Sequence, residues 1–264
     1  DSFSTRKKEI IDWIIAIQQI PAPTFGEAER AGFIESQFVQ LGLNDVGQDG
    51  INNVYGRFPG SNPAANKPVI ISAHSDTVFP AGTDLQVRKH NQTFYGPGLG
   101  DNSTGVAGLL AVADTLRRYG LQPRADLWFV SNVGEEGLGD LRGMRAVVDR
   151  FGRQATYIVV EGGLFGQIAH EAVGVRRFRI EVKTMGGHSW GSFGAASAIH
   201  ELSHLVAAIA RLNVPSRPKT TYNVGVIEGG TSVNTIASSA SMLLDLRSES
   251  AHELERLVKL ITDN

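Results

Sequence analysis

Four stretches decide the fold of this chain: ISAHSDTVFP (71–80), GPGLGDNSTGVAGLL (96–110), VSNVGEEGLGD (130–140) and YIVVEGG (157–163). Each is an apolar, β-branched run that ends in acidic residues or histidine, or a glycine-rich turn that opens into a helix. Buried strands of this kind deliver their terminal side chains to one edge of a sheet, which is where open α/β sheets build their sites. The four stretches therefore predict an α/β fold with a polar site at that edge.

The side chains that these stretches deliver are ligands for a metal ion. Several carboxylates together with an imidazole form a transition-metal ligand set, for which zinc is the common occupant. The sequence contains no cysteine, so any metal must be held by histidine and carboxylates.

The composition excludes several classes of partner. The chain has 264 residues, a hydrophobic fraction of 42% and a formal net charge of −2. Because it has neither a basic patch nor a polybasic tail, we expect no nucleic acid and no membrane as a partner. No apolar run reaches the roughly 18 residues of a membrane span, and residues 1–20 are spaced as an amphipathic helix and not as a signal peptide. We therefore expect a cytoplasmic protein.

The order of elements predicts two domains. Up to about residue 174, strands alternate with helices, which predicts a mostly parallel sheet with flanking helices in a catalytic domain, residues 1–174. Residues 175–264 read as a smaller α+β lid with the order β-α-β-β-α, one strand short of a ferredoxin-like unit. The expected lid elements are a strand at 176–184, a helix at 195–212, strands at 221–230 and 240–248, and a helix at 250–262.

The residues at the predicted edge suggest individual roles. A metal-bound imidazole usually donates its second N–H to a carboxylate, and Asp76 is placed to do this for His74. Asp101 opens a helix after a glycine-rich loop and could bridge two ions. Of Glu135 and Glu136, one can bind metal while the other acts as a general base toward metal-activated water. Glu161 supplies one more ligand.

These segments resemble a known family. HSDTVFP, GLGDNSTGVAG, VGEEGLGDLRG and VVEGG match, in order and spacing, the zinc aminoacylase, acetylornithine deacetylase, succinyl-diaminopimelate desuccinylase and glutamate carboxypeptidase family of co-catalytic metallopeptidases. In the lid, TMGGHSWGSFGAASAIHEL (184–202) and GGTSVNTIASSASMLLDLRS (229–248) resemble two further segments of that family. The resemblance covers nearly the whole chain.

The resemblance implies a role for each matching residue. Two zinc ions are expected, with Co²⁺ or Mn²⁺ as alternatives, and a cis peptide is expected after Asp101. The lid is expected to form a homodimer, and the substrates are expected to be small peptides or N-acyl amino acids with a free carboxylate. The implied roles are: His74 and Glu161 on one zinc, Asp101 bridging, Glu136 on the second zinc, Glu135 as general base, Asp76 orienting His74, His188 polarising the scissile carbonyl, and Asn234 and Arg247 holding the substrate.

The sequence departs from the family's pattern at its C-terminal end. The family's second zinc takes a final histidine well beyond the lid, whereas the printed sequence ends at Asn264, and His252 is a poor substitute. We therefore expect a truncated or abbreviated chain that lacks this ligand, the last lid strand and the end of the catalytic domain. Ala237 and Asn102 differ from the family's usual residues, which we expect to matter little.

Two other functions compete with this reading. His200-Glu201-Leu202-Ser203-His204 is a literal H-E-x-x-H, the signature of another class of zinc proteases. The apolar stripe of the helix runs through Ile199, Leu202, Val206, Ile209 and Leu212. This spacing turns both histidines toward solvent, which favours ordinary polar positions on a helix over a metal site. The remaining alternative is a non-catalytic binding or dimerisation module. The sequence as a whole favours a metal-dependent hydrolase of amide bonds.

Overall fold

The computed structural model describes residues 5–162 and 166–263, and it divides into two compact units, Asp1–Gln167 and Ile168–Asn264. We call these unit 1 and unit 2. The assignment of catalytic and lid roles to residues 1–174 and 175–264 stays a prediction.

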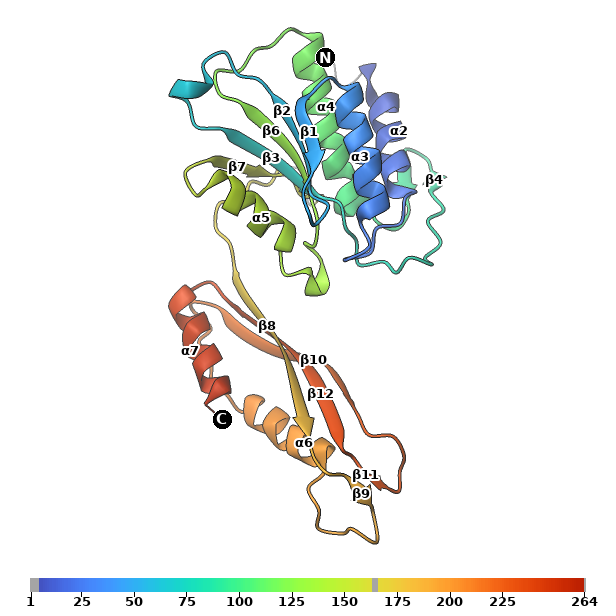
Figure 1. The fold of residues 1–264 in the computed structure, drawn as a ribbon, viewed down its shortest axis with the longest axis vertical. Coiled ribbons are helices and arrows are strands. Elements are labelled where there is room, and N and C mark those ends of the chain that lie inside the picture. Colours follow the sequence, from blue (N-terminus) through green and yellow to red (C-terminus); the bar gives the residue numbers. More distant parts are fainter. Residues whose placement is uncertain (1–4, 163–165, 264) are drawn as a thin grey trace. The chain divides into compact units, whose positions relative to one another are not determined.

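Unit 1 is built on a five-stranded sheet in the order β1-β2-β6-β3-β7 (Figure 1). Strands β3 and β6 pair in parallel, as do β3 and β7, while β2 pairs antiparallel with both β6 and β1. Four of the five strands therefore run in one direction, which confirms the predicted mostly parallel sheet. The bounds are β1 (Asn44–Gln48), β2 (Val54–Phe58), β3 (Val69–His74), β6 (Leu127–Asn132) and β7 (Thr156–Val159).

Helices cover both faces of this sheet because its strands are apolar on both sides. Helices α2 (Lys7–Gln18), α3 (Ala28–Gln40) and α4 (Thr104–Arg118) lie on one face, and α5 (Arg142–Phe151) lies on the other (Figure 1). Along β6, Phe129 packs with the first group and the next residue, Val130, packs against α5, as the two-residue period of a strand requires.

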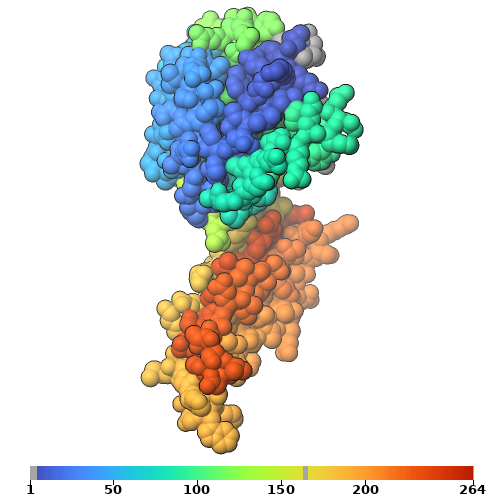
Figure 2. Space-filling model, turned by 90° about the vertical axis from the view of Figure 1, so that its right-hand side faces the viewer, coloured from blue at the N-terminus to red at the C-terminus, as the bar shows by residue number. Residues whose placement is uncertain are grey.

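Shorter elements complete unit 1. Strands β4 (Arg88–His90) and β5 (Thr93–Tyr95) form a hairpin, and Figure 2 shows its segment alongside α2. The side-chain amides of Gln18 and Gln19 donate to the Leu85 carbonyl and tie the two together. Three short helical turns are η1 (Pro63–Ala65), η2 (Leu99–Ser103) and η3 (Gly137–Gly139). Strand β1 was not predicted from the sequence.

Unit 2 has a three-stranded antiparallel sheet in the order β10-β12-β8, with two helices packed on it. Inward-facing Phe178, Ile180 and Val182 alternate with exposed polar residues along β8, as the sequence pattern predicts. The order of the long elements is the expected β-α-β-β-α, with a short pair, β9 and β11, added. The bounds are β8 (Gly174–Lys183), β9 (Gly187–His188), α6 (Ala198–Ile209), β10 (Thr220–Gly229), β11 (Thr235–Ile236), β12 (Ser239–Ser248) and α7 (Ala251–Thr262).

Within the described residues, no helix combines the length and the apolarity needed to cross a membrane. The cytoplasmic location stays a prediction.

Candidate metal centre

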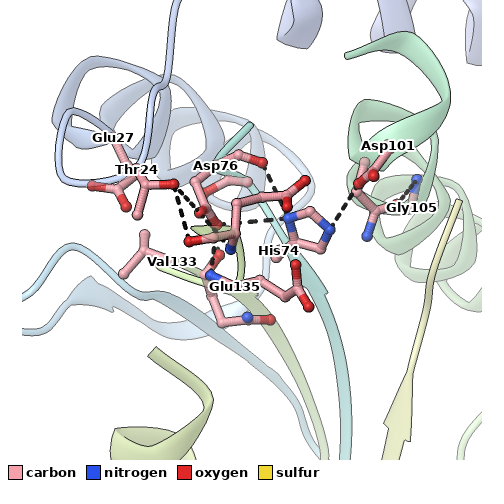
Figure 3. Close-up of polar contacts among 12 residues, drawn as sticks. Thr24, Glu27, His74, Asp76, Asp101, Gly105, Val133 and Glu135 are labelled. Atoms are coloured by element: carbon pink, nitrogen blue, oxygen red, sulfur yellow. Dashed lines mark hydrogen bonds and ion pairs between the residues drawn. The ribbon is translucent and has the colours of Figure 1, made fainter. Parts of the chain in front are cut away.

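The polar residues predicted at the edge of the sheet do gather there. His74 is the last residue of β3, Glu161 follows β7, and Glu135 and Glu136 lie in the loop after β6. Asp101 lies in η2, at the start of α4. Because β3, β6 and β7 are parallel neighbours, their carboxyl ends bring these side chains to one edge. Figure 3 shows the His74 ring between Asp76 and Asp101.

Three of these side chains have the spacing of ligands around one metal ion. His74 Nε2 lies 3.0 Å from Asp101 Oδ1 and 3.5 Å from Glu161 Oε2. Ligand atoms at 2.0–2.2 Å from a tetrahedral zinc are about 3.3 Å apart. The imidazole is buried, whereas the side chains of Asp101 and Glu161 are 62% and 51% exposed. The trio therefore fits a metal ion with one open side.

A second group shares the same imidazole. One ligand atom from each of His74, Glu135 and Glu136 lies within 4.8 Å of the others, the same limit that the first trio meets. Asp101, the predicted bridge, is close enough that its charge contributes to raising the pKa of Glu136. The separate roles predicted for Glu135 as base and Glu136 as ligand stay predictions.

Asp76 fixes the loop after β6 as well as the histidine. The nearest acceptor to His74 Nδ1 is the Asp76 backbone carbonyl at 3.1 Å, with carboxylate Oδ1 at 3.6 Å. The carboxylate itself accepts hydrogen bonds from the backbone N–H groups of Glu135 and Glu136, both at 3.0 Å, and from the Thr24 hydroxyl at 2.9 Å. Asp76 therefore ties the histidine to the two glutamates (Figure 3).

The charges of the site perturb one another strongly. Burial alone would lower the pKa of His74, but Asp76 and Glu161 outweigh it and raise the pKa to about 9. Burial, Asp101 and Glu135 raise the pKa of Glu136 to about 7, and burial also raises the pKa of Glu135. Burial would raise the pKa of Asp76 too, but its hydrogen bonds lower it. Crowding of carboxylates around one buried imidazole is thus a shared cause of the raised pKa values of His74, Glu135 and Glu136.

Asn102 connects two of the candidate ligands. Its side-chain amide donates to the Val160 carbonyl at 2.9 Å, just before Glu161, and its oxygen accepts from Gly105 N at 3.0 Å. It thus caps the start of α4 and holds Asp101 beside Glu161. The peptide between Asp101 and Asn102 is cis, as the resemblance implies.

Arg30 is a buried residue that supports the chain next to His74 and Asp76, and it was not predicted from the sequence. It donates to the carbonyl of Ser75, between His74 and Asp76, at 2.7 Å, and to the Ile20 carbonyl at 2.9 Å. Burial lowers the pKa of its guanidinium to about 10, with Asp76 opposing. The sequence does mark Arg30 as a buried charged residue, because it lies four residues before Ile34 on the apolar side of α3. Thr24, also missed, carries no comparable signal.

Unit 2 brings together two of its three predicted site residues. His188 in β9 pairs with Thr235 in β11, and Ser189 N donates to the Asn234 carbonyl at 3.0 Å. The backbone N–H groups of Trp190 and Gly191 lie 3.3 Å from His188 Nδ1. An Nδ1 that accepts these bonds leaves the ring proton on Nε2, where it can be donated.

Arg247 lies apart from this pair, near the far end of β12, where it is opposite Val175. Its Nε is 2.7 Å from Asp245 Oδ2, and Asp245 also accepts from Arg177 at 2.9 Å. Asp245 therefore forms ion pairs with two arginines, Arg247 and Arg177. About half of the Arg247 side chain is exposed.

The H-E-x-x-H segment does not form a metal site within residues 5–162 and 166–263. Neither candidate metal group includes His200 or His204. The side chain of His204 is 80% exposed, while Leu202 is buried in the core. His252 is 84% exposed and pairs with the adjacent Glu253.

Comparison with known families divides the chain as the structure does. Residues 53–168 match peptidase family M28, and residues 170–264 match the peptidase dimerisation domain. Together these matches cover the candidate metal centre and all of the long strands of unit 2.

Curated relatives and solved structures agree with these matches. The chain is 23% identical to carboxypeptidase G2 of Pseudomonas sp. over 90% of its own length and 59% of that protein. It is 28% identical to acetylornithine deacetylase of Myxococcus xanthus over 92% of its length and 65% of that protein. A tripeptidase structure from Staphylococcus aureus shares the fold with a TM-score of 0.70 and 22% identity, over 97% of this chain and 70% of that one. The chain thus spans about three fifths of these curated relatives.

Proposed function

We propose that this chain, a member of the M20/M28 zinc peptidase family, acts as a metal-dependent hydrolase that cleaves amide bonds in small peptides or N-acyl amino acids. The observation that supports this most strongly is the convergence of His74, Asp101 and Glu161, with Glu135 and Glu136 beside them, at separations suited to zinc ligands. Family membership supplies the class of reaction, and the site supplies the chemistry.

The metal would be held by the side chains of the sheet edge. His74 and Glu161 would bind one ion, Glu136 the second, and Asp101 would lie between them. When bound, such ions polarise the scissile carbonyl and activate the attacking water. Zinc commonly binds imidazole and carboxylate donors, and Co²⁺ or Mn²⁺ would accept the same set.

Glu135 is the proposed general base. It is part of the group around His74, and its backbone is fixed by the Asp76 carboxylate. Burial and the neighbouring negative charges raise its pKa, so it can take a proton from water and deliver it to the leaving amine. Asp76, which contacts both residues, would hold Glu135 at a fixed position relative to His74.

Unit 2 would contribute the substrate contacts. A proton on His188 Nε2 could be donated to the carbonyl of the scissile amide, and Asn234 lies beside it. The terminal amino groups of Arg247 are suited to a bidentate contact with a substrate carboxylate. The relatives named carboxypeptidase and deacetylase support substrates with such a carboxylate. The match of residues 170–264 to the dimerisation domain supports a homodimer formed through unit 2.

The test is hydrolysis of dipeptides and N-acetyl amino acids by the zinc-loaded chain and by Glu135→Gln. We expect Glu135→Gln to keep its zinc and to lose at least about a hundredfold in rate, the scale of general-base catalysis. Glu201→Gln, in the H-E-x-x-H segment, is the matched control and should retain the rate. Hydrolysis that survives Glu135→Gln and is lost in Glu201→Gln would refute the proposal. A wild-type chain that binds no zinc and hydrolyses nothing would favour a non-catalytic module.

A further inference from the structure

We infer that Asn53 is a positioning residue that closes the loop carrying Glu135 and Glu136. This loop, residues 133–143, begins after β6 and ends in the first turn of α5. The inference rests on the proposed function, because it concerns how the proposed base and metal ligand are held. Asn53 precedes β2 and is completely buried.

The side-chain amide of Asn53 bonds to both ends of the loop. Its oxygen accepts from Val133 N at 3.0 Å, and its amino group donates to the Gly143 carbonyl at 3.1 Å. Gly143 N in turn donates to the Val133 carbonyl at 3.0 Å. One amide and one backbone bond therefore close the loop at its base, while the Asp76 carboxylate holds Glu135 and Glu136 at its other side.

The closure leaves no space for a larger residue at its base. A Cβ atom at Gly143 would lie 2.2 Å from the Val133 carbonyl oxygen and 2.5 Å from Asn53 Oδ1. Real Cβ atoms do not approach other atoms so closely, so the contact requires glycine here. The two chain segments are thus pressed together at the point where Asn53 joins them.

A second set of bonds fixes which way the amide faces. Asp49 Oδ2 accepts from the Asn53 amino group at 2.8 Å, and Asp49 Oδ1 accepts from the Asn53 backbone N–H at 2.9 Å. Because the carboxylate can only accept, the amino group must face Asp49 and Gly143, and the oxygen must face Val133. The Tyr55 hydroxyl also donates to Asp49 Oδ2, at 2.8 Å.

Asparagine is the residue that this geometry requires. The site needs two N–H donors, for Asp49 and for the Gly143 carbonyl, and one acceptor on a short side chain, and alanine supplies none of these. Aspartate keeps the acceptor for Val133 N, but it lacks the donors and would place a second carboxylate oxygen against Asp49 Oδ2. Glu135 is only two residues from Val133. If the loop opens where Asn53 closes it, the carboxylate of Glu135, the proposed general base, is therefore displaced. A displacement of about 1 Å costs about a hundredfold in rate.

The experiment compares Asn53→Ala and Asn53→Asp with Tyr55→Phe in the full chain. Tyr55→Phe removes two hydrogen bonds from the same buried network, the one that the hydroxyl donates to Asp49 and the one that it accepts from the Asn53 amino group at 3.3 Å, and it leaves both ends of the loop bonded. For Asn53→Ala we expect kcat to fall about a hundredfold with KM changed less than threefold, and for Asn53→Asp a loss at least as large, because its carboxylate would also repel Asp49. Tyr55→Phe should lower the melting temperature and keep kcat within about threefold.

Amide hydrogen exchange supplies a readout that does not depend on activity. In Asn53→Ala and Asn53→Asp, exchange should accelerate at Val133, Glu135 and Glu136 and stay unchanged along β3. Local acceleration with an inactive wild-type chain would support the inference while refuting the proposed function. Unchanged exchange in the loop, or a loss of kcat in Tyr55→Phe equal to that in Asn53→Asp, would overturn the inference. Asn53→Ser, which keeps a small polar side chain and adds no charge, should show the same local acceleration of exchange and keeps the test decisive if the other two variants do not fold.

Discussion

Replacing Asp76 by asparagine tests how the candidate metal centre is held together. The Asp76 carboxylate is fully buried and accepts from Glu135 N, Glu136 N and the Thr24 hydroxyl at 2.9–3.0 Å. Asparagine keeps one acceptor oxygen, so its amino group must face at least one of these donors. A hydrogen bond to a charged group contributes about 1.5–3 kcal/mol. Losing one such bond and weakening the others should cost about 3 kcal/mol.

The assay is thermal unfolding of the metal-free chain. For a unit of this size, a loss of about 3 kcal/mol lowers the melting temperature of unit 1 by about 6–12 °C. Thr24→Val is the matched control, because it removes one neutral donor and should cost about 1 kcal/mol. The pKa of Asp76 is lowered, so its ionised form stabilises the fold above the ordinary value of 3.8. The difference between the wild type and Asp76→Asn should therefore shrink as the pH falls below about 3.8. A loss below about 1 kcal/mol, or one equal to that of Thr24→Val, would refute this reasoning.

Three further predictions concern charged residues, two in or near the candidate metal centre and one in the H-E-x-x-H segment of unit 2. The free energy of unfolding of the metal-free chain should fall as the pH rises from about 5 to 9, because His74 (pKa about 9) and Glu136 (pKa about 7) bind protons more tightly when folded than when unfolded. Urea titrations at a series of pH values should show this fall, and a flat profile would contradict it. Arg30→Met should destabilise the chain by about 2–4 kcal/mol, since it leaves the buried Ser75 carbonyl without its donor, and calorimetry giving less than about 1 kcal/mol would argue against that role. Glu201→Gln should leave zinc content and hydrolysis unchanged within about twofold, and a loss of either would revive the H-E-x-x-H reading.

The sequence predicted the edge of the sheet better than it predicted what holds that edge in place. His74, Asp101, Glu135, Glu136 and Glu161 were predictable because each follows an apolar run or a glycine-rich turn, and parallel strands bring such ends together. The parallel pairing of β3 with β6 and β7 is enough to place these residues close together.

The residues that support the site by hydrogen bonds could not be predicted from the sequence, because their partners are distant in the chain. Asn53 and Thr24 act through hydrogen bonds to residues that are 80 and 52 positions away in the chain. No local period marks a side chain whose partner is so distant. Asp76 was predicted as a partner of His74, but its bonds to the backbone of Glu135 and Glu136 depend on how the loop after β6 folds back. Strand β1 was missed because NDVGQ is short and polar, with little β-propensity.

We expect the edge formed by His74, Asp101 and Glu161 to bind a metal ion. A calorimetric titration of zinc into the metal-free chain, into His74→Ala and into Glu135→Gln tests this expectation. Zinc should bind saturably to the wild type, fail to bind to His74→Ala, and still bind to Glu135→Gln. Zinc binding that is unchanged in His74→Ala would show that the ion is held elsewhere in the chain and that the proposed metal centre is wrong.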